Sequence, residues 1–429
     1  MTDWKIEKLV PGGEGMSRLE GGGVGFARGV VPGDIIRVES LKRHAGFQRA
    51  EGWSLVSPGA SRSEPPCPVQ ERCGGCDWMH LELGAQRVAK LGILREALVR
   101  TGGFQAATLP QIRLESAGSD TGYRRRAQLQ VDPKGRVGFF SAGTHDLVEV
   151  ERCMVCDPRL EEMLRELRTL ASQGHFRGFS RLELRVADHA PERLVRATPA
   201  KQRGKRGARP SASLDARLAA AGISLVIAGS PDDSAMMQRW DLGNDVVLAA
   251  PAAAFTQVNA AVNRAMVSAV VSGAQARQIT RFLDLYCGAG NFSFPLAASG
   301  FAGVGVEISA AAVSAAEANL LAETERLGRP LELRFIAGDA ERVLREIADP
   351  RFDLIVLDPP RAGAKESVPL VVASDARWLC MCSCDPVTLA RDLKSLVQAG
   401  FVIEEIAAYD MFPHTHHVEA LVWLRRATR

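Results

Sequence analysis

The sequence lacks a long apolar run. A membrane-spanning helix needs about 18 to 20 consecutive apolar residues. The nearest approach, "LAAPAAAF" at 248–255, is short and is interrupted by Pro251. The beginning, "MTDWKIEKLV", also lacks the basic start and the apolar stretch of a secretory signal peptide. These absences predict a protein without membrane association that works in the cytoplasm.

A large excess of one charge sign is also missing, because 53 Lys and Arg stand against 50 Asp and Glu. The positive residues are concentrated in "YRRRAQLQVDPKGR" (123–136) and "KQRGKRGARP" (201–210). Such stretches suit a polyanionic partner such as nucleic acid. For 201–210 a solvated loop is an equal alternative, since the stretch is rich in glycine and ends in proline. Around Arg124–Arg126 the alternation that follows predicts an ordered strand.

No internal repeat is present, and 429 residues predict two or three domains. Residues 1–56 hold short β-like runs between glycine clusters, which predicts a small antiparallel barrel. Residues 57–248 mix strands and helices, as in an α+β domain, and the helical segment 81–103 is expected to pack on the domain that follows. Residues 249–429 alternate helices with seven candidate strands, which predicts an α/β domain with a doubly wound, Rossmann-like parallel sheet.

The nine cysteines come without a secretory signal, which favours reduced thiols, metal ligands or catalysis over disulfides. Cys67, Cys73 and Cys76 are spaced C-x5-C-x2-C, a density of thiols typical of a metal site. A fourth ligand would come from Cys153 or Cys156. Zinc and an iron–sulfur cubane are both compatible with four cysteines.

The C-terminal third suggests a cofactor pocket at the ends of its predicted strands. In "RFLDLYCGAGNFSFPLA" a buried strand meets Gly288 and Gly290, which would let the backbone approach a ligand. The following strands end at Glu307, suited to ribose hydroxyls, and at Asp339, suited to an adenine edge. The next ends at Asp358, which opens "DPPR". Nicotinamide and S-adenosylmethionine sites share the first features, but Asp-Pro-Pro favours a methyltransferase.

Two details indicate which kind of atom accepts the methyl group. Enzymes that methylate amino groups of bases usually carry an aromatic residue after the two prolines, and this chain has Arg361 there. This difference argues against methylation of an amino group. In "LCMCSCDPVTLARD" Cys380, Cys382 and Cys384 share one strand face, and Asp385 and Pro386 then begin a helix. Cys384 therefore stands at the strand tip beside a helix N-terminus, a position expected to lower the thiol pKa.

A thiolate is useful when the acceptor is carbon 5 of uracil. Addition of sulfur to carbon 6 makes carbon 5 nucleophilic, and a base must afterwards remove the carbon 5 proton. Glu419, in the apolar stretch "HVEALVWL", is the candidate base, since burial raises the pKa of a carboxyl group. Metal binding by His414, His416 and His417 is less favoured, because no Cys or acid stands at ligand spacing.

Taken together, these motifs resemble the RNA 5-methyluridine (uracil-C5) methyltransferase family, especially its iron–sulfur-containing 23S rRNA branch. The segments that carry the resemblance are "FTQVN", "LDLYCGAGNFSFPLA", "GVEIS", "LDPPRAG", "SCDPVTLARDL" and "MFPHTHHVE". It implies a class I S-adenosylmethionine-dependent methyltransferase domain, an N-terminal OB-like RNA-binding barrel called TRAM, and a central domain carrying an iron–sulfur cluster.

The resemblance also implies roles for single residues. Cys384 is the nucleophile and Glu419 the base, while Gln257, Tyr286, Glu307 and Asp358 contact S-adenosylmethionine. A [4Fe-4S] cluster binds Cys67, Cys73 and Cys76, and the family's pattern of a Cys followed five residues later by Pro selects Cys153 as the fourth ligand. The expected substrate is ribosomal RNA with transfer RNA as the alternative, and the expected state is a monomer.

The chain departs from the family pattern at two positions. Asp385 replaces the usual Asn after the nucleophile, and its carboxylate is expected to oppose thiolate formation at Cys384. "HTHH" lacks the usual Gly, which is expected to alter the loop that presents Glu419. Two other classes of function remain open from sequence: a non-catalytic RNA-binding metalloprotein and a nicotinamide oxidoreductase.

Overall fold

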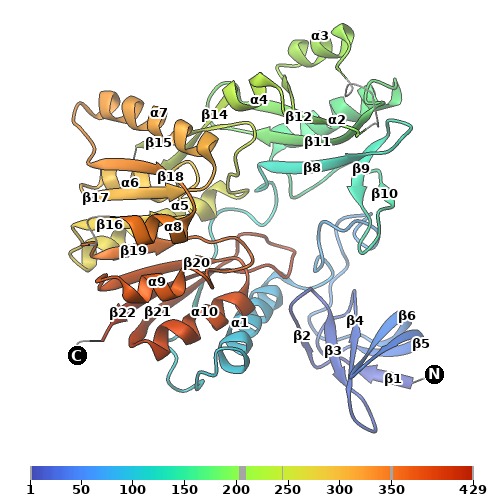
Figure 1. The fold of residues 1–429 in the computed structure, drawn as a ribbon. Helices are drawn as coiled ribbons and strands as arrows, with labels where there is room; N and C mark the ends of the chain where they lie inside the picture. The colour runs from blue at the N-terminus through green and yellow to red at the C-terminus, as the bar shows by residue number, and fades with distance from the viewer. Residues whose placement is uncertain (1, 202–208, 244, 348–350, 428–429) are drawn as a thin grey trace.

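The computed structural model describes residues 2–201, 209–243, 245–347 and 351–427, and Figure 1 shows their arrangement. These described residues form three large sheets and one two-stranded sheet. The basic stretch predicted at 201–210 lies almost wholly outside the described residues. Within the described part of the chain, no helix combines the length and apolarity needed to traverse a bilayer.

The N-terminal residues form a six-stranded sheet in the order β1-β5-β6-β4-β3-β2. Its neighbouring strands are antiparallel except β4 and β6. Trp4, Ile36 and Val38 are among the buried side chains of its core. The mostly antiparallel pairing agrees with the prediction, and the identification as an OB-like TRAM barrel remains a prediction. The strands are β1 Thr2–Lys5, β2 Lys8–Leu9, β3 Gly15–Arg18, β4 Val24–Ala27, β5 Ile35–His44 and β6 Phe47–Ser57.

A second six-stranded sheet occupies the middle of the chain, in the order β10-β9-β8-β11-β12-β13. Helix α2 begins at Pro158 and is capped by Asp157, whose carboxylate accepts a hydrogen bond from Arg159 N. The apolar stripe of α2 packs against the sheet through Leu160, Leu164 and Leu167. The elements are β8 Arg126–Val131, β9 Val137–Phe140, β10 Leu147–Val148, α2 Pro158–Ser172, β11 Phe179–Val186, β12 Arg193–Pro199, α3 Ala212–Ala220, β13 Ser224–Ile227 and α4 Pro231–Ala235.

The C-terminal sheet contains all seven strands predicted there, in the order β18-β17-β16-β19-β20-β22-β21. The first five are parallel, and β22 runs antiparallel between β20 and β21. Helices cover both faces, which explains the continuous apolar runs of the central strands. The doubly wound α/β prediction is confirmed. The elements are α5 Ala260–Ala276, β16 Arg281–Leu285, α6 Ser293–Ala298, β17 Ala302–Glu307, α7 Ala310–Leu327, β18 Leu333–Ala337, α8 Ala340–Glu346, β19 Leu354–Leu357, α9 Val368–Ala373, β20 Trp378–Ser383, α10 Pro386–Gln398, β21 Phe401–Tyr409 and β22 Glu419–Arg426.

Two segments from the predicted central region pack with this C-terminal sheet. Helix α1 (Leu83–Arg100) packs against α10 as expected, and β7 (Arg113–Glu115) adds an eighth strand, parallel to β21. The hairpin β14 (Met237–Gly243) and β15 (Val246–Pro251) contributes Trp240 to the same core as α5. The domain borders expected at 56 and 248 remain predictions.

A glycine in the parallel sheet gives a test of this packing. A Cβ atom at Gly303 in β17 would lie 2.1 Å from the Phe282 ring, so Gly303→Ala should destabilise the fold by about 1–3 kcal/mol. Gly92, exposed in α1 with open space around it, is the matched control. There the same change should stabilise by about 0.5–1 kcal/mol, because alanine favours a helix. Urea unfolding midpoints should therefore move in opposite directions, and a shared direction would contradict this packing.

Candidate functional site

The predicted site residues gather at the carboxyl ends of the C-terminal sheet strands. Glu307 is the last residue of β17, Asp358 directly follows β19, and Cys384 follows β20 by one residue. Neighbouring parallel strands place these ends along one edge, since Leu285 of β16 pairs with both Val306 and Leu357. This is the edge where open α/β sheets bind ligands.

The glycine turn after β16 has an open side. Tyr286 and Gly288 both have φ near +60°, and Gly288 N donates to Glu307 Oε2 at 3.1 Å. A Cβ atom at Gly288 would meet nothing within 4 Å, so a ligand can approach the backbone there. Gly290 differs, because its Cβ would lie 2.6 Å from the Phe294 ring. Glycine at 290 is therefore required by packing and by its φ of +102°, not by ligand approach.

The other predicted cofactor residues lie on several segments. The Tyr286 hydroxyl lies 2.6 Å from Ser367 Oγ and donates to Glu341 Oε1 at 3.2 Å. Asp339 caps α8 by accepting a hydrogen bond from Arg342 N. Gln257 is half-buried in the loop between β15 and α5. Glu307 also accepts from Ser309 N at 2.8 Å.

Cys384 and Glu419 face each other across two antiparallel strands. Ser383 of β20 pairs with Ala420 of β22, and one further step in that register sets Cys384 opposite Glu419. Directly opposed residues of an antiparallel pair have Cβ atoms about 4.5–5.5 Å apart. Two groups that lie 35 positions apart in the sequence therefore meet because the two strands share a register.

The electrostatics of this pair come mainly from burial. Burial, with the nearby Asp358 carboxylate, raises the pKa of Glu419 to about 8, and burial raises the pKa of Asp358 to about 6. Burial and the Glu419 charge raise the pKa of Cys384 to about 11, while the Arg361 guanidinium opposes this shift. The expectation of a lowered thiol pKa is wrong, because desolvation outweighs the helix N-terminus.

The Asp385 side chain caps the N-terminus of helix α10. Its carboxylate accepts hydrogen bonds from Val387 N at 3.0 Å and Thr388 N at 2.8 Å, so it caps α10 as expected. Burial and the Glu419 and Asp358 carboxylates are among the causes that raise the pKa of Cys384. An added effect of Asp385 on Cys384 remains a hypothesis.

Asp284 is a buried acid that the sequence reading missed. It lies in the middle of β16, fully buried, and Ser293 Oγ donates to its Oδ2 at 2.6 Å. Burial raises the pKa of Asp284 to about 7, and its Oδ1 has no hydrogen-bond partner. The available signal was a single carboxylate inside the apolar run "RFLDLYC".

The cysteines predicted as metal ligands lie near one another, with their segments packed around Met79 and Val155. Burial raises the pKa of Cys76 to about 12, and the thiols of Cys153, Cys73 and Cys67 raise it further. Within the described residues, no group of three or more Cys, His, Asp or Glu side chains has an arrangement that could hold a metal ion. The side-chain geometry therefore does not support a metal site. The four thiols are nevertheless close enough for the other three to affect the pKa of Cys76.

One buried cation bears on what this cysteine group could accommodate. Arg124 lies beside Cys76, Cys153 and Cys156, and its Nε atom is buried without a hydrogen-bond partner. A guanidinium in that position would compensate an anionic group bound by thiolates. The residues present therefore fit such a group in charge.

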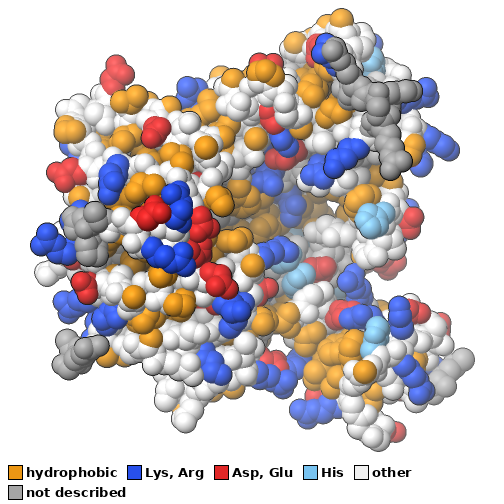
Figure 2. Space-filling view, viewed as in Figure 1, with side chains coloured by type: hydrophobic (Ala, Val, Ile, Leu, Met, Phe, Trp, Pro, Cys, Tyr) orange, Lys and Arg blue, Asp and Glu red, His pale blue; other side chains and the backbone are white. Residues whose placement is uncertain are grey.

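Figure 2 shows a hollow in the centre of one face, between the C-terminal sheet on the left and the two other sheets on the right. Lys and Arg side chains line parts of its rim. A concave surface with this charge can receive a polyanion.

The sequence matches known proteins along almost its entire length. Residues 241–427 match the family model described as tRNA (Uracil-5-)-methyltransferase. The chain is 35% identical to the 23S rRNA (uracil(1939)-C(5))-methyltransferase RlmD of Halomonas elongata, over 98% of this chain and 88% of that protein. It is 32% identical to the protein of the same name from Pectobacterium atrosepticum, over 97% and 92%.

A solved structure has the same fold. The tRNA (uracil-54, C5)-methyltransferase of Pyrococcus abyssi, in complex with S-adenosyl-L-homocysteine, superposes with a TM-score of 0.74 at 24% identity. The match covers 99% of this chain and 100% of that one. Because nearly full-length relatives exceed 30% identity, the chain belongs to the S-adenosylmethionine-dependent RNA uracil-C5 methyltransferase family.

Proposed function

We propose that this enzyme methylates carbon 5 of one uridine in 23S rRNA, at the position that corresponds to 1939 in its relatives. The observation that carries the proposal is the Cys384–Glu419 register, together with relatives of that activity over nearly the full chain. Transfer RNA is the second candidate substrate, because the matching family model is described as a tRNA methyltransferase. Membership of the family excludes the nicotinamide oxidoreductase alternative.

The proposed reaction assigns one task to each of the opposed groups. Cys384 Sγ forms a bond to carbon 6 of uracil, which moves electron density to carbon 5. S-adenosylmethionine, when bound, supplies the methyl group. The Glu419 carboxylate then takes the proton from carbon 5, and the electrons of that C–H bond expel the Cys384 thiolate. The enzyme ends with its thiolate restored and one proton on Glu419.

Protonation must change during the reaction, because the raised pKa values favour a proton on both groups at neutral pH. A positive charge beside Asp358, Glu419 and Cys384 would favour their ionised forms. Arg361 supplies one such charge permanently, since it lowers the pKa of both Cys384 and Glu419. The sulfonium of the methyl donor would supply another.

Six residues are proposed to hold the methyl donor: Gln257, Tyr286, Gly288, Glu307, Asp339 and Asp358. The open space over Gly288 supports this assignment, and so does the place of Glu307 at the next strand end. The Tyr286 hydroxyl is already engaged with Ser367, so its ring is the part proposed to contact the ligand.

A [4Fe-4S] cluster on Cys67, Cys73, Cys76 and Cys153 is proposed for the cysteine group. Support comes from the mutual proximity of the thiols and from the buried Arg124 guanidinium that faces them. The N-terminal sheet is proposed to be the TRAM barrel, binding RNA together with the rim of the central hollow. A flipped uridine from a loop of folded RNA would reach Cys384 at the least cost.

The covalent step can be tested with RNA that carries 5-fluorouridine, since fluorine at carbon 5 cannot be removed by a base. The parent enzyme should form an adduct stable in denaturing gels, and Cys384→Ala should form none. Cys382→Ala, a buried thiol two residues earlier, is the control and should still form it. Peptide mass spectrometry should locate the adduct at Cys384; an adduct elsewhere would contradict the mechanism. Fragments of 23S rRNA and a tRNA, compared as substrates, separate the two candidates.

The raised pKa of Glu419 predicts a pH-dependent stability. The folded state keeps this proton up to about pH 8, whereas an unfolded Glu releases it near 4.5. Unfolding therefore releases a proton in this window, and stability falls as pH rises, by up to about 1.4 kcal/mol per pH unit. Glu419→Gln removes this loss. The thermal midpoint of the variant should therefore rise relative to that of the parent as the pH increases from 5 to 8. Glu151→Gln, 90% exposed, should show a constant difference.

Metal analysis tests the cluster. Anaerobically purified protein should be brown and contain about four iron and four sulfide per chain. Cys153→Ser should lose the colour, and Cys156→Ser should keep it. Colourless protein with about one zinc per chain would replace the cluster by a zinc site, and absence of both metals would refute a metal centre.

A further inference from the structure

The loop that precedes Glu419 has no regular secondary structure of its own. It runs from Asp410 to Val418, between β21 and β22, and is called the base loop below. Glu419 is the first residue of β22, so the base loop sets how this carboxyl group enters the site. Contacts from outside the loop must fix its shape.

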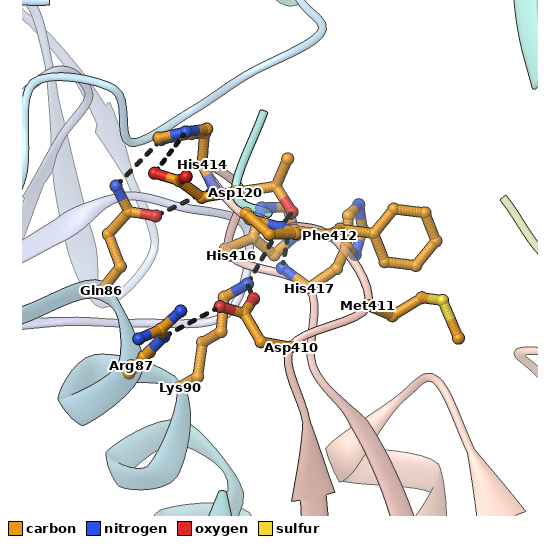
Figure 3. Close-up of polar contacts among 12 residues, drawn as sticks. Gln86, Arg87, Lys90, Asp120, Asp410, Met411, Phe412, His414, His416 and His417 are labelled. Atoms are coloured by element: carbon orange, nitrogen blue, oxygen red, sulfur yellow. Dashed lines mark hydrogen bonds and ion pairs between the residues drawn. The ribbon is translucent and has the colours of Figure 1, made fainter. Parts of the chain in front are cut away.

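Helix α1 provides the first set of contacts (Figure 3). Lys90 Nζ donates to Asp410 Oδ1 at 2.6 Å and to Phe412 O at 2.8 Å, and both charged side chains are fully buried. Gln86 uses both ends of its amide: its Oε1 accepts from His414 N at 2.9 Å, and its Nε2 donates to His414 Nδ1 at 3.2 Å. The start of the base loop is thereby fixed to the helix.

His414 itself has an unusual backbone conformation. Its φ is +66°, in the left-handed region that non-glycine residues adopt at a cost. The conformation is retained because its backbone is bonded on both sides, with Trp78 N donating to His414 O at 3.0 Å. Trp78 is completely buried and also donates through Nε1 to Gly13 O at 3.1 Å. The middle of the base loop therefore depends on the segment that follows Cys76.

The last part of the loop is joined to the same segment by one side-chain pair. His416 Nδ1 donates to Asp77 Oδ2 at 2.6 Å, and His416 N lies 3.4 Å from the same oxygen. The two side chains are 22% and 30% exposed. The N-terminal sheet closes over them, because a Cβ at Gly13 would lie 3.0 Å from Asp77 Cβ and 3.3 Å from His416 Nδ1. A glycine at 416 could not donate from a side chain.

We propose that His416 is a positioning residue: bonded to Asp77, it fixes the base loop so that Glu419 is aimed at the carbon 5 proton. This inference rests on the proposed role of Glu419 as the base. The Cys67–Cys76 segment thus acts on the active site at a distance, through Asp77 and Trp78. Addition of Cys384 to carbon 6 needs no proton transfer to Glu419, whereas release of the product does, and the link should therefore affect release far more than addition.

The decisive change is His416→Gly, measured with ordinary uridine RNA. Product release should slow about 10- to 100-fold, because small misplacement of a reacting group has effects of that size. The covalent adduct should accumulate during turnover, while its rate of formation and the KM for RNA stay at the parent values. His416→Asn, which keeps a donor near the Nδ1 position, should restore release. Asp77→Ala removes the acceptor of the same hydrogen bond, so it should slow product release as His416→Gly does. It serves as the second variant if His416→Gly fails to fold.

The matched control is His189→Gly, which removes a similar His–Asp pair, His189 Nε2 to Asp241 Oδ1 at 2.7 Å, outside the base loop. It should behave as the parent does. Hydrogen exchange on the free proteins gives a readout without RNA: His416→Gly should raise exchange in 76–80 and 410–418 together. Unchanged exchange, or slower adduct formation in step with release, would overturn the proposal.

Failure of the proposed function gives a different result. A parent enzyme that forms no adduct with any RNA overturns the Cys384 mechanism and, with it, this role of His416. A parent that forms the adduct and releases product, beside a His416→Gly variant with the same release rate, overturns the positioning role alone.

Discussion

The antiparallel register between β20 and β22 is the constraint on which the active site depends. A strand passes residues alternately to its two faces, so a shift of one residue would turn Glu419 away from Cys384. The register is secured by the apolar side chains of both strands, which are buried on both faces of the sheet. The core that stabilises the fold is thus also the device that brings nucleophile and base together.

The site contains several carboxyl groups that are buried away from water. Asp284, Asp358 and Glu419 all have raised pKa values, and the largest cause in each case is burial. Ionised carboxylates are unfavourable in such surroundings, and a bound cation would stabilise them. A positively charged methyl donor would find a site whose charge is complementary to it, and its neutral product would leave that site more readily.

The sequence predicted local features well and distant pairings poorly. All seven C-terminal strands, the cap Asp385, and the placement of Cys384 at a strand tip followed from periodicity and capping chemistry. The thiol pKa was predicted in the wrong direction, because the amount of water excluded from Cys384 depends on residues far along the chain. The His416–Asp77 pair spans 339 positions, and no local pattern signals it. The roles of the site residues and the domain borders remain predictions. Geometry alone does not define which ligand a residue binds or where a domain ends.

The short strand β7 has a consequence for how the chain is divided. It covers the outer edge of β21, and α1 covers the apolar side of α10, although both come from far ahead of the matched region 241–427. A fragment limited to that region would expose the unpaired edge of β21 and the apolar face of α10. Such surfaces are the usual starting points of aggregation. On the ribosome, the early residues must therefore wait until the last third has been synthesised before either part reaches its final surroundings.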